Sequence, residues 1–502
     1  MKVKLLFSLD LAEKLVVADA RNLLFNYLFA RHHHGQLLVR LEDVPGVDAH
    51  AAGSPLDTAH WMGLEFDNEP VNPLAERPAE KASDKPSDKA VEKLPVLRRS
   101  ERTEHYRHFA DKLVDANLAY RCFCSRDTLV AMVNAQKIHG QTPHYDGRCL
   151  RLSASDREAL TAKGTPFQVR LRKPEVVSEV NDIVRGRLVF DQTEMADWVL
   201  MRYDSMPTQA LANVVDHHLL GITHVMRGDR HKADTPREAF LRQALNLKNP
   251  DYIHLPLILG EDRSLLSERH AEKYAEDYRA RGYMPDAFLN YLLHHGLKTG
   301  VEDSLRTSGQ MIKLFKLEEI NEAPSIWQLE KLQYLNRLAL DKFKDEALTQ
   351  MLAPYVKQAG EDLFARGDVW AREFVTAIRS SLNCLSDVKD SVEMFFSDKA
   401  TPDKKGQNLL KDPDAKKVVE ALEAAIEKLP EVTYDNYREV MEAARNSIAA
   451  KSKALMVIRV SLTGREIGPE FSKLLPLLGK QRLLSRLENA RRYIPKGMKK
   501  DY

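Results

Sequence analysis

The sequence predicts an α/β front half joined to an all-helical back half, and three observations support this. Val3 to Phe7 and Leu37 to Leu41 are short apolar runs typical of buried strands. Lys14 to Arg31, between them, carries apolar residues at helical spacing. Strand, helix and strand in this order are typical of a βαβ unit in a parallel sheet. After about Trp327 the chain is almost entirely amphipathic helix with short breaks.

A parallel sheet also predicts where a ligand binds, because ligands lie at the carboxyl ends of its strands. Phe7 to Asp10 and Glu42-Asp43 close the two predicted strands, so we expect them at the rim of a site. Between about Pro166 and Leu200 short β-rich runs recur, such as Phe167 to Leu171. From about Tyr278 onward the pattern turns helical.

The composition is typical of a globular protein without a strong charge bias. The chain has 502 residues, of which 43% are hydrophobic and 29% charged, and this length favours roughly three domains. A net charge of +2 gives no global basic field, so any RNA contact needs a local basic patch. Asp10 and Glu13 break the apolar N-terminal run, and no stretch has the length of a membrane span. We therefore expect a cytoplasmic protein without a signal peptide or membrane segment.

Residues 75–95 form a charged, repetitive stretch that is almost free of large apolar side chains. Such a stretch buries too little apolar surface to offset the entropy of ordering. We predict a flexible insertion here. The alternative, a functional basic tract, is disfavoured because both charge signs are mixed along it.

Six separated segments share their residues and their order with one known family. They are Ala20 to Arg31, Tyr145 to Cys149, Asp182 to Gly186, Pro207 to Gly228, His254 to Gly260 and Ser461 to Gly464. In these segments the chain resembles bacterial-type glutamyl-tRNA synthetases, a group of class I aminoacyl-tRNA synthetases. The resemblance extends over roughly residues 3 to 490, apart from the insertion.

The resemblance implies an α/β Rossmann-like catalytic domain with an inserted α+β acceptor-stem-binding domain, followed by an all-α anticodon-binding domain. The expected boundaries are 1–104 for the first half of the Rossmann domain, 105–205 for the inserted acceptor-binding and zinc-like region, 206–326 for the second Rossmann half with a stem-contact region, and 327–502 for the helical domain. The family joins glutamate to ATP, with Mg, and passes the glutamyl group to tRNA. This chemistry depends on positioned phosphates and a stabilised developing charge.

The first ATP signature of the family, an H-I-G-H-like stretch, opens the helix after the first strand. Extension from Ala20 without gaps places Val16, Val17, Ala18 and Asp19 there. Valine cannot donate a hydrogen bond to phosphate, and Asp19 suits an early helix position but not a phosphate. We therefore expect Val16 and Val17 to be core residues.

The second ATP signature, a K-M-S-K-S-like loop, corresponds to Leu265, Leu266, Ser267, Glu268 and Arg269. Leu265 and Glu268 stand where the family has lysines that pair with ATP phosphates. The change at Glu268 inverts a charge. At about 4 Å and a dielectric constant of about 20, each unit of charge contributes on the order of 4 kcal/mol at most.

The amino-acid pocket of the family is retained in part. By the family pattern Arg227 pairs with a substrate carboxylate, Asn213 hydrogen-bonds the substrate and Glu42 takes its amino group. For Arg227 and Asn213 the alternative is a purely structural hydrogen bond. Other pocket positions differ from the family pattern: Leu6, Asp10, Gln209 and the turn Gly228-Asp229-Arg230-His231.

Three cysteines match a zinc position of some family members, namely Cys122, Cys124 and Cys149. Zinc needs four nitrogen or sulfur ligands, and Arg151 stands where the family has the fourth. His139, His144 or Tyr145 are possible substitutes. The alternative is a set of buried thiols that hold no metal.

In the helical half, the overall pattern of the family is better retained than the individual residues that contact the anticodon. Ser381 aligns loosely with an arginine that family members direct to the anticodon. Basic residues gather near the C-terminus at Lys480, Arg482, Arg486, Arg491 and Arg492. A solvated helix face explains them more simply than an RNA contact.

The sequence therefore favours a catalytically impaired paralogue, a pseudo-synthetase that keeps the fold and binds tRNA, an active synthetase or another protein. By resemblance the tRNA is tRNA(Glu), and we expect a monomer. The first alternative is a working glutamate–tRNA ligase that uses ATP and Mg. A ligase that glutamylates another acceptor and a scaffold without RNA contact are further alternatives.

Overall fold

A computed structural model describes residues 2–43, 48–49, 51, 53–69, 95–173, 177–191, 196–266, 273–298 and 304–495. The predicted flexible insertion at 75–95 lies outside these residues, except for residue 95. The chain forms two compact units. Unit 1 comprises residues 1–280 and 285–335, and unit 2 comprises residues 281–284 and 336–502.

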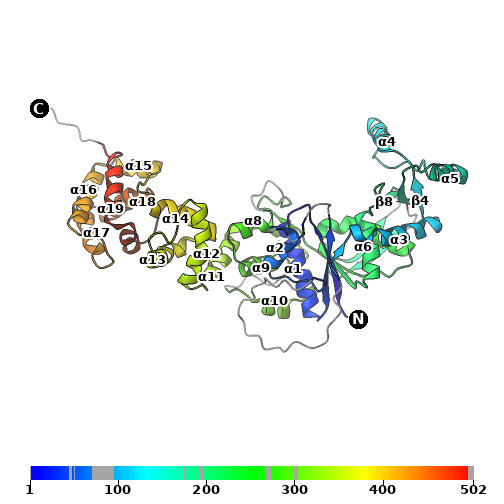
Figure 1. The fold of residues 1–502 in the computed structure, drawn as a ribbon, viewed down its shortest axis with the longest axis horizontal. Coiled ribbons are helices and arrows are strands. Elements are labelled where there is room, and N and C mark those ends of the chain that lie inside the picture. The colour runs from blue at the N-terminus through cyan, green and yellow to red at the C-terminus, as the bar shows by residue number, and fades with distance from the viewer. Residues whose placement is uncertain are drawn as a thin grey trace. The chain divides into compact units, whose positions relative to one another are not determined.

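Unit 1 is built on parallel strands, as the βαβ pattern predicts (Figure 1). Strands β1 (Lys4–Asp10), β2 (Gln36–Glu42) and β3 (Leu97–Arg98) form one parallel sheet in the order β1-β2-β3. Strands β9 (His224–Gly228) and β10 (Asp251–Leu255) are parallel neighbours in a second sheet. The Thr223 N–H donates to the Lys4 carbonyl at 3.0 Å, so β9 continues beside β1.

The second sheet also contains β6 (Val177–Asp182) and β7 (Gly186–Asp191), in the order β7-β6-β10-β9. A separate antiparallel sheet has the order β4-β5-β8, with β4 (Ala119–Cys122), β5 (Gln168–Leu171) and β8 (Trp198–Met201). Strands β11 (Ile258–Leu259) and β12 (Ser325–Ile326) form a short parallel pair. These strands include the β-rich region predicted between Pro166 and Leu200.

Helix α1 (Val17–His32) begins three residues later than the sequence predicts. The reason is a strand-like contact: Val16 forms a bridge with Tyr274, and the Val17 N–H donates to the Lys273 carbonyl at 2.8 Å. The segment before the helix is therefore extended. Helix α1 contacts both β1 and β9, which explains why most of its residues are buried.

The other helices of unit 1 are α2 (Pro55–Trp61), α3 (Thr103–Asp115), α4 (Arg126–Ile138), α5 (Ala154–Ala162), α6 (Gln209–Leu219), α7 (Thr235–Ala244), α8 (Ala275–Ala280), α9 (Pro285–His294) and α10 (Ser308–Leu314). Helix α11 (Leu329–Leu340) contains the boundary between the two units. Helices α3 and α6 pack against β8, where Tyr106, Leu200 and Leu211 belong to one buried core.

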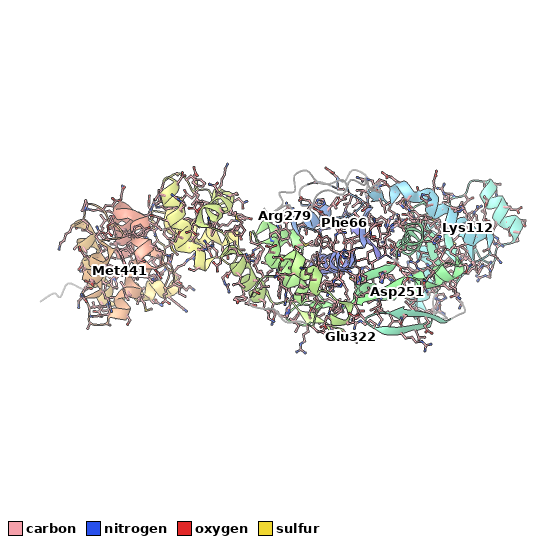
Figure 2. The ribbon with its side chains drawn as sticks, turned by 90° about the horizontal axis from the view of Figure 1, so that it is seen from below. Phe66, Lys112, Asp251, Arg279, Glu322 and Met441 are labelled. Carbon is pink, nitrogen blue, oxygen red and sulfur yellow. The ribbon has the colours of Figure 1, made fainter. Side chains whose placement is uncertain are left out.

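Unit 2 is helical, as the periodicity after Trp327 predicts. Its helices are α12 (Asp345–Gln358), α13 (Asp368–Ile378), α14 (Val388–Phe396), α15 (Lys404–Leu410), α16 (Pro413–Glu427), α17 (Tyr437–Arg445), α18 (Lys451–Thr463) and α19 (Phe471–Arg491). Helix α16 packs against α17, α18 and α19. Met441, labelled in Figure 2, lies on α17 and is buried among these helices.

A steric constraint explains why residue 464 of unit 2 is a glycine. Gly464 ends α18 with a φ of 75°, in the left-handed region. A Cβ at this position would lie 2.5 Å from the Thr401 carbonyl oxygen. Glycine is therefore required here, both for its backbone angle and for the close approach.

Among the described residues no helix is both long and apolar enough to cross a membrane.

The least usual feature of the unit 1 core is a buried ion network around Arg40. Its guanidinium donates to Glu42 Oε1 at 2.6 Å, to Asp216 Oδ2 at 2.9 Å and to Asn213 Oδ1 at 2.8 Å. Burial opposes the charge of Arg40, but the carboxylates of Glu42 and Asp216 outweigh this and hold its pKa above the usual value. The network joins β2 to α6.

We expect Arg40→Ala to destabilise unit 1 by about 3–5 kcal/mol, because it leaves buried carboxylates without their cation. Urea denaturation of the full chain measures the effect. Arg187→Ala is the matched control, since Arg187 pairs with Glu179 on the surface and its loss should leave stability almost unchanged. Equal stability losses in the two variants would contradict the importance of the network.

Candidate functional site

A pocket of about 610 Å³ opens at the carboxyl ends of β1 and β9. Parallel sheets place ligands at this edge, so its position agrees with the prediction for Phe7 to Asp10. Its polar and charged lining residues are Ser8, Asp10, Glu13, Lys14, Asp19, Asn22, Glu42, Thr208, Gln209, Asn213, His217, Arg227, Arg230, His231, Asp234, Arg237 and Glu238. The pocket thus collects residues from β1, β2, α1, α6, β9 and α7.

The three residues predicted to bind the amino acid all line this pocket. Glu42 is held by two arginines: its Oε1 accepts from Arg40, and its Oε2 forms an ion pair with Arg99 Nη1 at 2.5 Å. Asn213 Oδ1 accepts from Arg40 at 2.8 Å. The structure therefore brings Glu42, Asn213 and Arg227 together, and each already has protein partners.

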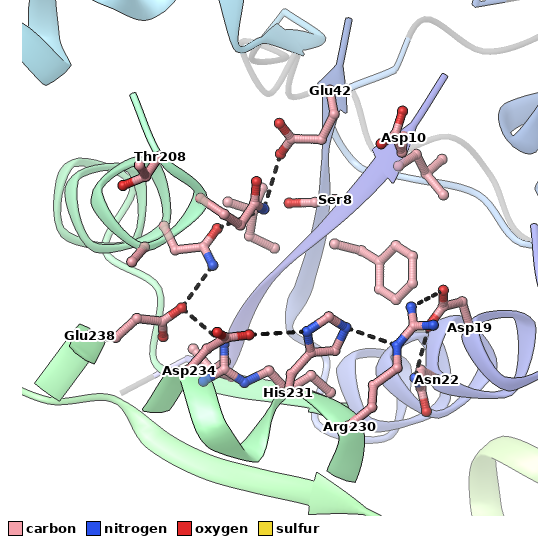
Figure 3. Close-up of a pocket in the computed structure, with 18 of the residues that line it drawn as sticks. Ser8, Asp10, Asp19, Asn22, Glu42, Thr208, Arg230, His231, Asp234 and Glu238 are labelled. Carbon is pink, nitrogen blue, oxygen red and sulfur yellow. Dashed lines mark hydrogen bonds and ion pairs between the residues drawn. The ribbon is translucent and has the colours of Figure 1, made fainter. Parts of the chain in front are cut away.

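Arg227 is paired with Glu238, a residue of α7. Arg227 Nη1 donates to Glu238 Oε1 at 2.9 Å and Arg227 Nη2 donates to Thr235 Oγ1 at 2.8 Å. Asn213 Nδ2 donates to the same Glu238 oxygen at 2.8 Å. Burial opposes the charge of Arg227, but Glu238 raises its pKa above the usual value. Figure 3 shows the carboxylate of Glu238 with dashed lines to neighbouring side chains of the pocket.

The first signature region lies where the sequence places it, at the start of α1. Val17 is fully buried, Val16 is partly buried and Ala18 carries no polar group. Asp19 lines the pocket and forms an ion pair with Arg230 at 2.5 Å. None of these four side chains can donate a hydrogen bond, because three are apolar and the fourth is an ionised acid.

Arg230 continues into a short polar chain across the pocket wall. Its Nε contacts His231 Nε2 at 3.0 Å, and His231 Nδ1 contacts Asp234 Oδ2 at 3.4 Å. Figure 3 shows Asp19, Arg230, His231 and Asp234 in this order along one side of the pocket. Within the turn Gly228-Asp229-Arg230-His231, Arg230 therefore contacts the first signature through Asp19.

The second signature is described only in part. Leu265 is largely exposed and forms a bridge with Leu259. Leu266 follows it, whereas Ser267, Glu268 and Arg269 lie outside the described residues.

The remaining changed positions also lie at the pocket. Leu6 supplies an apolar wall, and Asp10 accepts a hydrogen bond from its own loop at Ala12 N, 2.9 Å away. Gln209 Nε2 donates to Glu42 Oε1 at 3.3 Å.

The cysteine cluster forms as predicted. The three sulfurs of Cys122, Cys124 and Cys149 lie within 4.8 Å of one another and are buried. Tyr145 joins them: its hydroxyl oxygen is 3.3 Å from Cys122 Sγ and 3.6 Å from Cys124 Sγ. A hydrogen bond with Cys149 lowers the pKa of Cys122, and burial raises the pKa of Tyr145.

The two histidines considered as fourth ligands are placed differently. His139 and His144 are both exposed, and His144 Nδ1 contacts the Thr142 carbonyl at 2.9 Å. Arg151 donates to the Asp146 carbonyl at 2.8 Å. Of the candidates that the sequence offers, Tyr145 is the one in contact with the cysteine sulfurs.

The basic residues of α19 do not share one solvated face. Arg486 is fully buried and donates to the carbonyls of Leu462, Met394 and Ser397, so its interpretation as a surface residue is wrong. Lys480 donates to the Leu429 carbonyl at 2.6 Å. Ser381 is exposed and donates to the Ile378 carbonyl at 2.6 Å.

Two contacts in the pocket could not be predicted from the sequence. Glu238 lies within an amphipathic helix where a carboxylate has no visible partner, since Arg227 is eleven positions earlier. The pairing of Asp19 with Arg230 crosses 211 positions. Neither contact has a local sequence signal.

Known protein families match nearly the whole chain. Residues 13–334 match the family of class I tRNA synthetases (E and Q), catalytic domain, and residues 335–491 match an anticodon binding domain. The chain is 31% identical to the glutamate–tRNA ligase of Desulforamulus reducens over 98% of this chain and 100% of that protein. It is 30% identical to the glutamate–tRNA ligase of Geobacillus stearothermophilus, over 94% and 95% of the two chains.

Solved structures agree on the fold. A glutamate–tRNA synthetase from Elizabethkingia anophelis superposes with a TM-score of 0.75 at 23% identity, over 98% of this chain and 100% of that one. Family match, overall sequence and fold lead to one conclusion. The chain belongs to the glutamate–tRNA ligase family of class I aminoacyl-tRNA synthetases.

Proposed function

We propose that this chain is a tRNA-binding member of its family in which activation of glutamate by ATP is impaired. The observation that carries the proposal is the start of α1, where buried Val17 and the acid Asp19 stand beside the pocket. Loss of a single preorganised donor costs about 10²–10³ in rate in other enzymes. Here the signature lacks a donor, and Asp19 adds a negative charge that opposes phosphate.

The second support is the amino-acid end of the pocket. Glu42 is engaged by Arg40 and Arg99, and Arg227 by Glu238 and Thr235. A substrate amino group or carboxylate must compete with these contacts. Substrate binding is therefore expected to be weak even before ATP is considered.

The tRNA side of the proposal depends on the family match. The anticodon binding domain match extends over residues 335–491, nearly all of unit 2. By family membership the RNA is tRNA(Glu). An active synthetase or another protein remains a second predicted partner.

A working glutamate–tRNA ligase is the alternative function. It is favoured by the two relatives that match nearly the whole chain and are both glutamate–tRNA ligases. Family members use ATP with Mg. On this alternative, Arg230 and other pocket cations replace the lost phosphate contacts.

We also propose that Cys122, Cys124, Cys149 and Tyr145 bind one zinc ion. The three cysteine sulfurs supply three of the four ligands that tetrahedral zinc needs, and the phenol oxygen of Tyr145 would be the fourth. The support is their mutual contact, with Cys124 Sγ and Cys149 Sγ 3.4 Å apart. Sulfur ligands on tetrahedral zinc lie about 3.8 Å from one another, so small shifts suffice.

Glutamate charging of total tRNA tests the central proposal. We expect a rate at least about 10³-fold below that of the Geobacillus stearothermophilus ligase under the same conditions, because the phosphate donors are absent. Arg227→Ala, purified identically, controls for contaminating host enzyme. Glu268→Lys alone should not restore activity, since it leaves the first signature unchanged. Charging comparable to the control ligase, and lost in Arg227→Ala, would establish the alternative.

Retained tRNA binding predicts a strong dependence on salt, because phosphate contacts release counterions. Fluorescence anisotropy with tRNA(Glu) between low and physiological salt should show affinity falling steeply. A minihelix that lacks the anticodon arm should bind more weakly than the full tRNA. Absence of binding at low salt would contradict the proposal and favour a scaffold that does not contact RNA.

Elemental analysis of protein purified from zinc-supplemented medium tests the metal site. We expect about one zinc per chain, with occupancy reduced in Cys124→Ser and Tyr145→Phe. His144→Ala is the control and should retain zinc, because His144 is exposed and bonded elsewhere. Zinc-free wild-type protein, or unchanged occupancy in Cys124→Ser, would exclude the site.

A further inference from the structure

Three of the six segments that resemble the family meet at one chain of hydrogen bonds behind the pocket. Asp182 begins one of these segments, His254 begins another, and Arg227 lies in a third. Arg227 and His254 are neighbours in register on the parallel strands β9 and β10. The side chains of Asp182 and His254 are fully buried, whereas Arg227 lines the pocket. The chain of hydrogen bonds therefore leads from the core to a residue that can contact a ligand.

Asp182 fixes the position of the proton on the His254 ring. Asp182 Oδ1 accepts from the backbone N–H groups of Val184 and Arg185, at 2.9 and 2.6 Å. Its Oδ2 accepts from the His254 backbone N–H at 3.0 Å and lies 2.7 Å from His254 Nδ1. Because three N–H groups already donate to Asp182, its carboxylate acts as an acceptor, and Nδ1 carries the proton. The other ring nitrogen, Nε2, is then an acceptor.

The acceptor Nε2 of His254 faces Arg227 and Thr235. It lies 3.4 Å from Arg227 Nε, which can only donate, and 3.0 Å from Thr235 Oγ1. Arg227 Nη2 donates to the same Thr235 oxygen at 2.8 Å. The Thr235 hydroxyl therefore directs its own hydrogen to His254 Nε2. One assignment of protons satisfies every contact from Asp182 to Arg227.

This network restricts the orientations that the Arg227 guanidinium can adopt. An arginine side chain has many rotamers, and its planar fork binds a carboxylate best when those rotamers are already restricted. Nε and Nη2 of Arg227 are held by His254 and Thr235, and Nη1 donates to Glu238 at 2.9 Å. Asp182, Thr235 and His254 lie outside the pocket lining, so their effect on a ligand passes through Arg227.

We infer that His254 is a positioning residue for Arg227, which it holds directly and through Thr235, and that Asp182 sets the tautomer that this role requires. The inference rests on the proposed assignment of Arg227 to a substrate carboxylate. It applies to either carboxylate of an amino acid, because the network orients the guanidinium and not the ligand.

Nuclear magnetic resonance of the full chain with ¹⁵N-labelled arginine, without ATP or tRNA, tests the inference. Arg227→Lys identifies the Arg227 Nε–H signal by its disappearance. His254→Gln places an amide oxygen near the position of Nε2 and keeps an acceptor for Arg227. His254→Asn is shorter, so it keeps a donor for Asp182 and loses that acceptor. We expect exchange of the Arg227 Nε–H with water to be about tenfold faster than wild type in His254→Asn, and close to wild type in His254→Gln.

Equal exchange rates in the two His254 variants would overturn the inference, because a role in packing alone does not depend on the acceptor. His224→Asn is the matched control. His224 begins the strand that contains Arg227, pairs with Asp251 and lies outside the pocket lining. Its replacement should leave the Arg227 signal unchanged.

If a His254 variant does not fold, Thr235→Ser and Thr235→Val decide the question by the same measurement. Serine keeps the hydroxyl that links Arg227 to His254, and valine removes it at nearly the same size. Faster exchange in Thr235→Val than in Thr235→Ser is the expected result. Equal rates in these two variants would overturn the inference.

L-glutamate at millimolar concentrations gives the ligand readout. It should shift the Arg227 signal in the wild type and in His254→Gln, with half-saturation about tenfold higher in His254→Asn. No shift in the wild type, or equal half-saturation in the two variants, would overturn the inference. Since ATP and tRNA are absent, these results do not depend on whether the chain activates an amino acid, so failure here is distinct from failure of the proposed function.

Discussion

The pairing of Arg40 and Arg227 with carboxylates of the same chain is the constraint on which the pocket of unit 1 depends. Arg40 holds Glu42 and Asp216, and Arg227 holds Glu238. A buried ion pair contributes little net stability, but removal of one partner is strongly destabilising. These contacts therefore keep the pocket walls in one arrangement. They also occupy groups that would otherwise face a substrate.

This constraint explains how a family fold can persist while the nucleotide end changes. The parallel sheet needs apolar side chains on β1, β2 and α1, and a buried Val17 meets that need well. The phosphate contacts of the family, in contrast, serve only the reaction. A valine at position 17 is compatible with this packing, and Asp19 pairs with Arg230.

Much of this architecture follows from local pattern. The strands near Leu5 and Leu38, the helix between them and the helical back half are visible as periodicity, because apolar spacing reports the buried face. The start of α1 is not, since Val16 pairs with Tyr274 across the sequence. The burial of Arg486 could not be predicted for a similar reason. The carbonyls to which it donates belong to residues far away in the sequence, and nothing near Arg486 indicates them.

The site, too, has a part that the sequence predicts and a part that it does not. Glu42, Asn213 and Arg227 are located through the family resemblance, and the structure brings them to one pocket. Their partners Glu238 and Arg99 lie on other segments of the chain, and a single sequence carries no record of such contacts. Tyr145 was predictable only in part. The sequence offers it as one of several candidates near the cysteines, and its contact with Cys122 distinguishes it from the others.

Direct titration with ATP and Mg tests the central proposal, which is that the fold is kept while nucleotide handling is impaired. The matched reference is the Geobacillus stearothermophilus relative, measured in the same buffer with and without tRNA(Glu). The account predicts no saturable binding of ATP by this chain at concentrations that saturate the reference. Saturable binding with comparable affinity would contradict it, and the chain would then be understood as a working ligase with altered phosphate contacts.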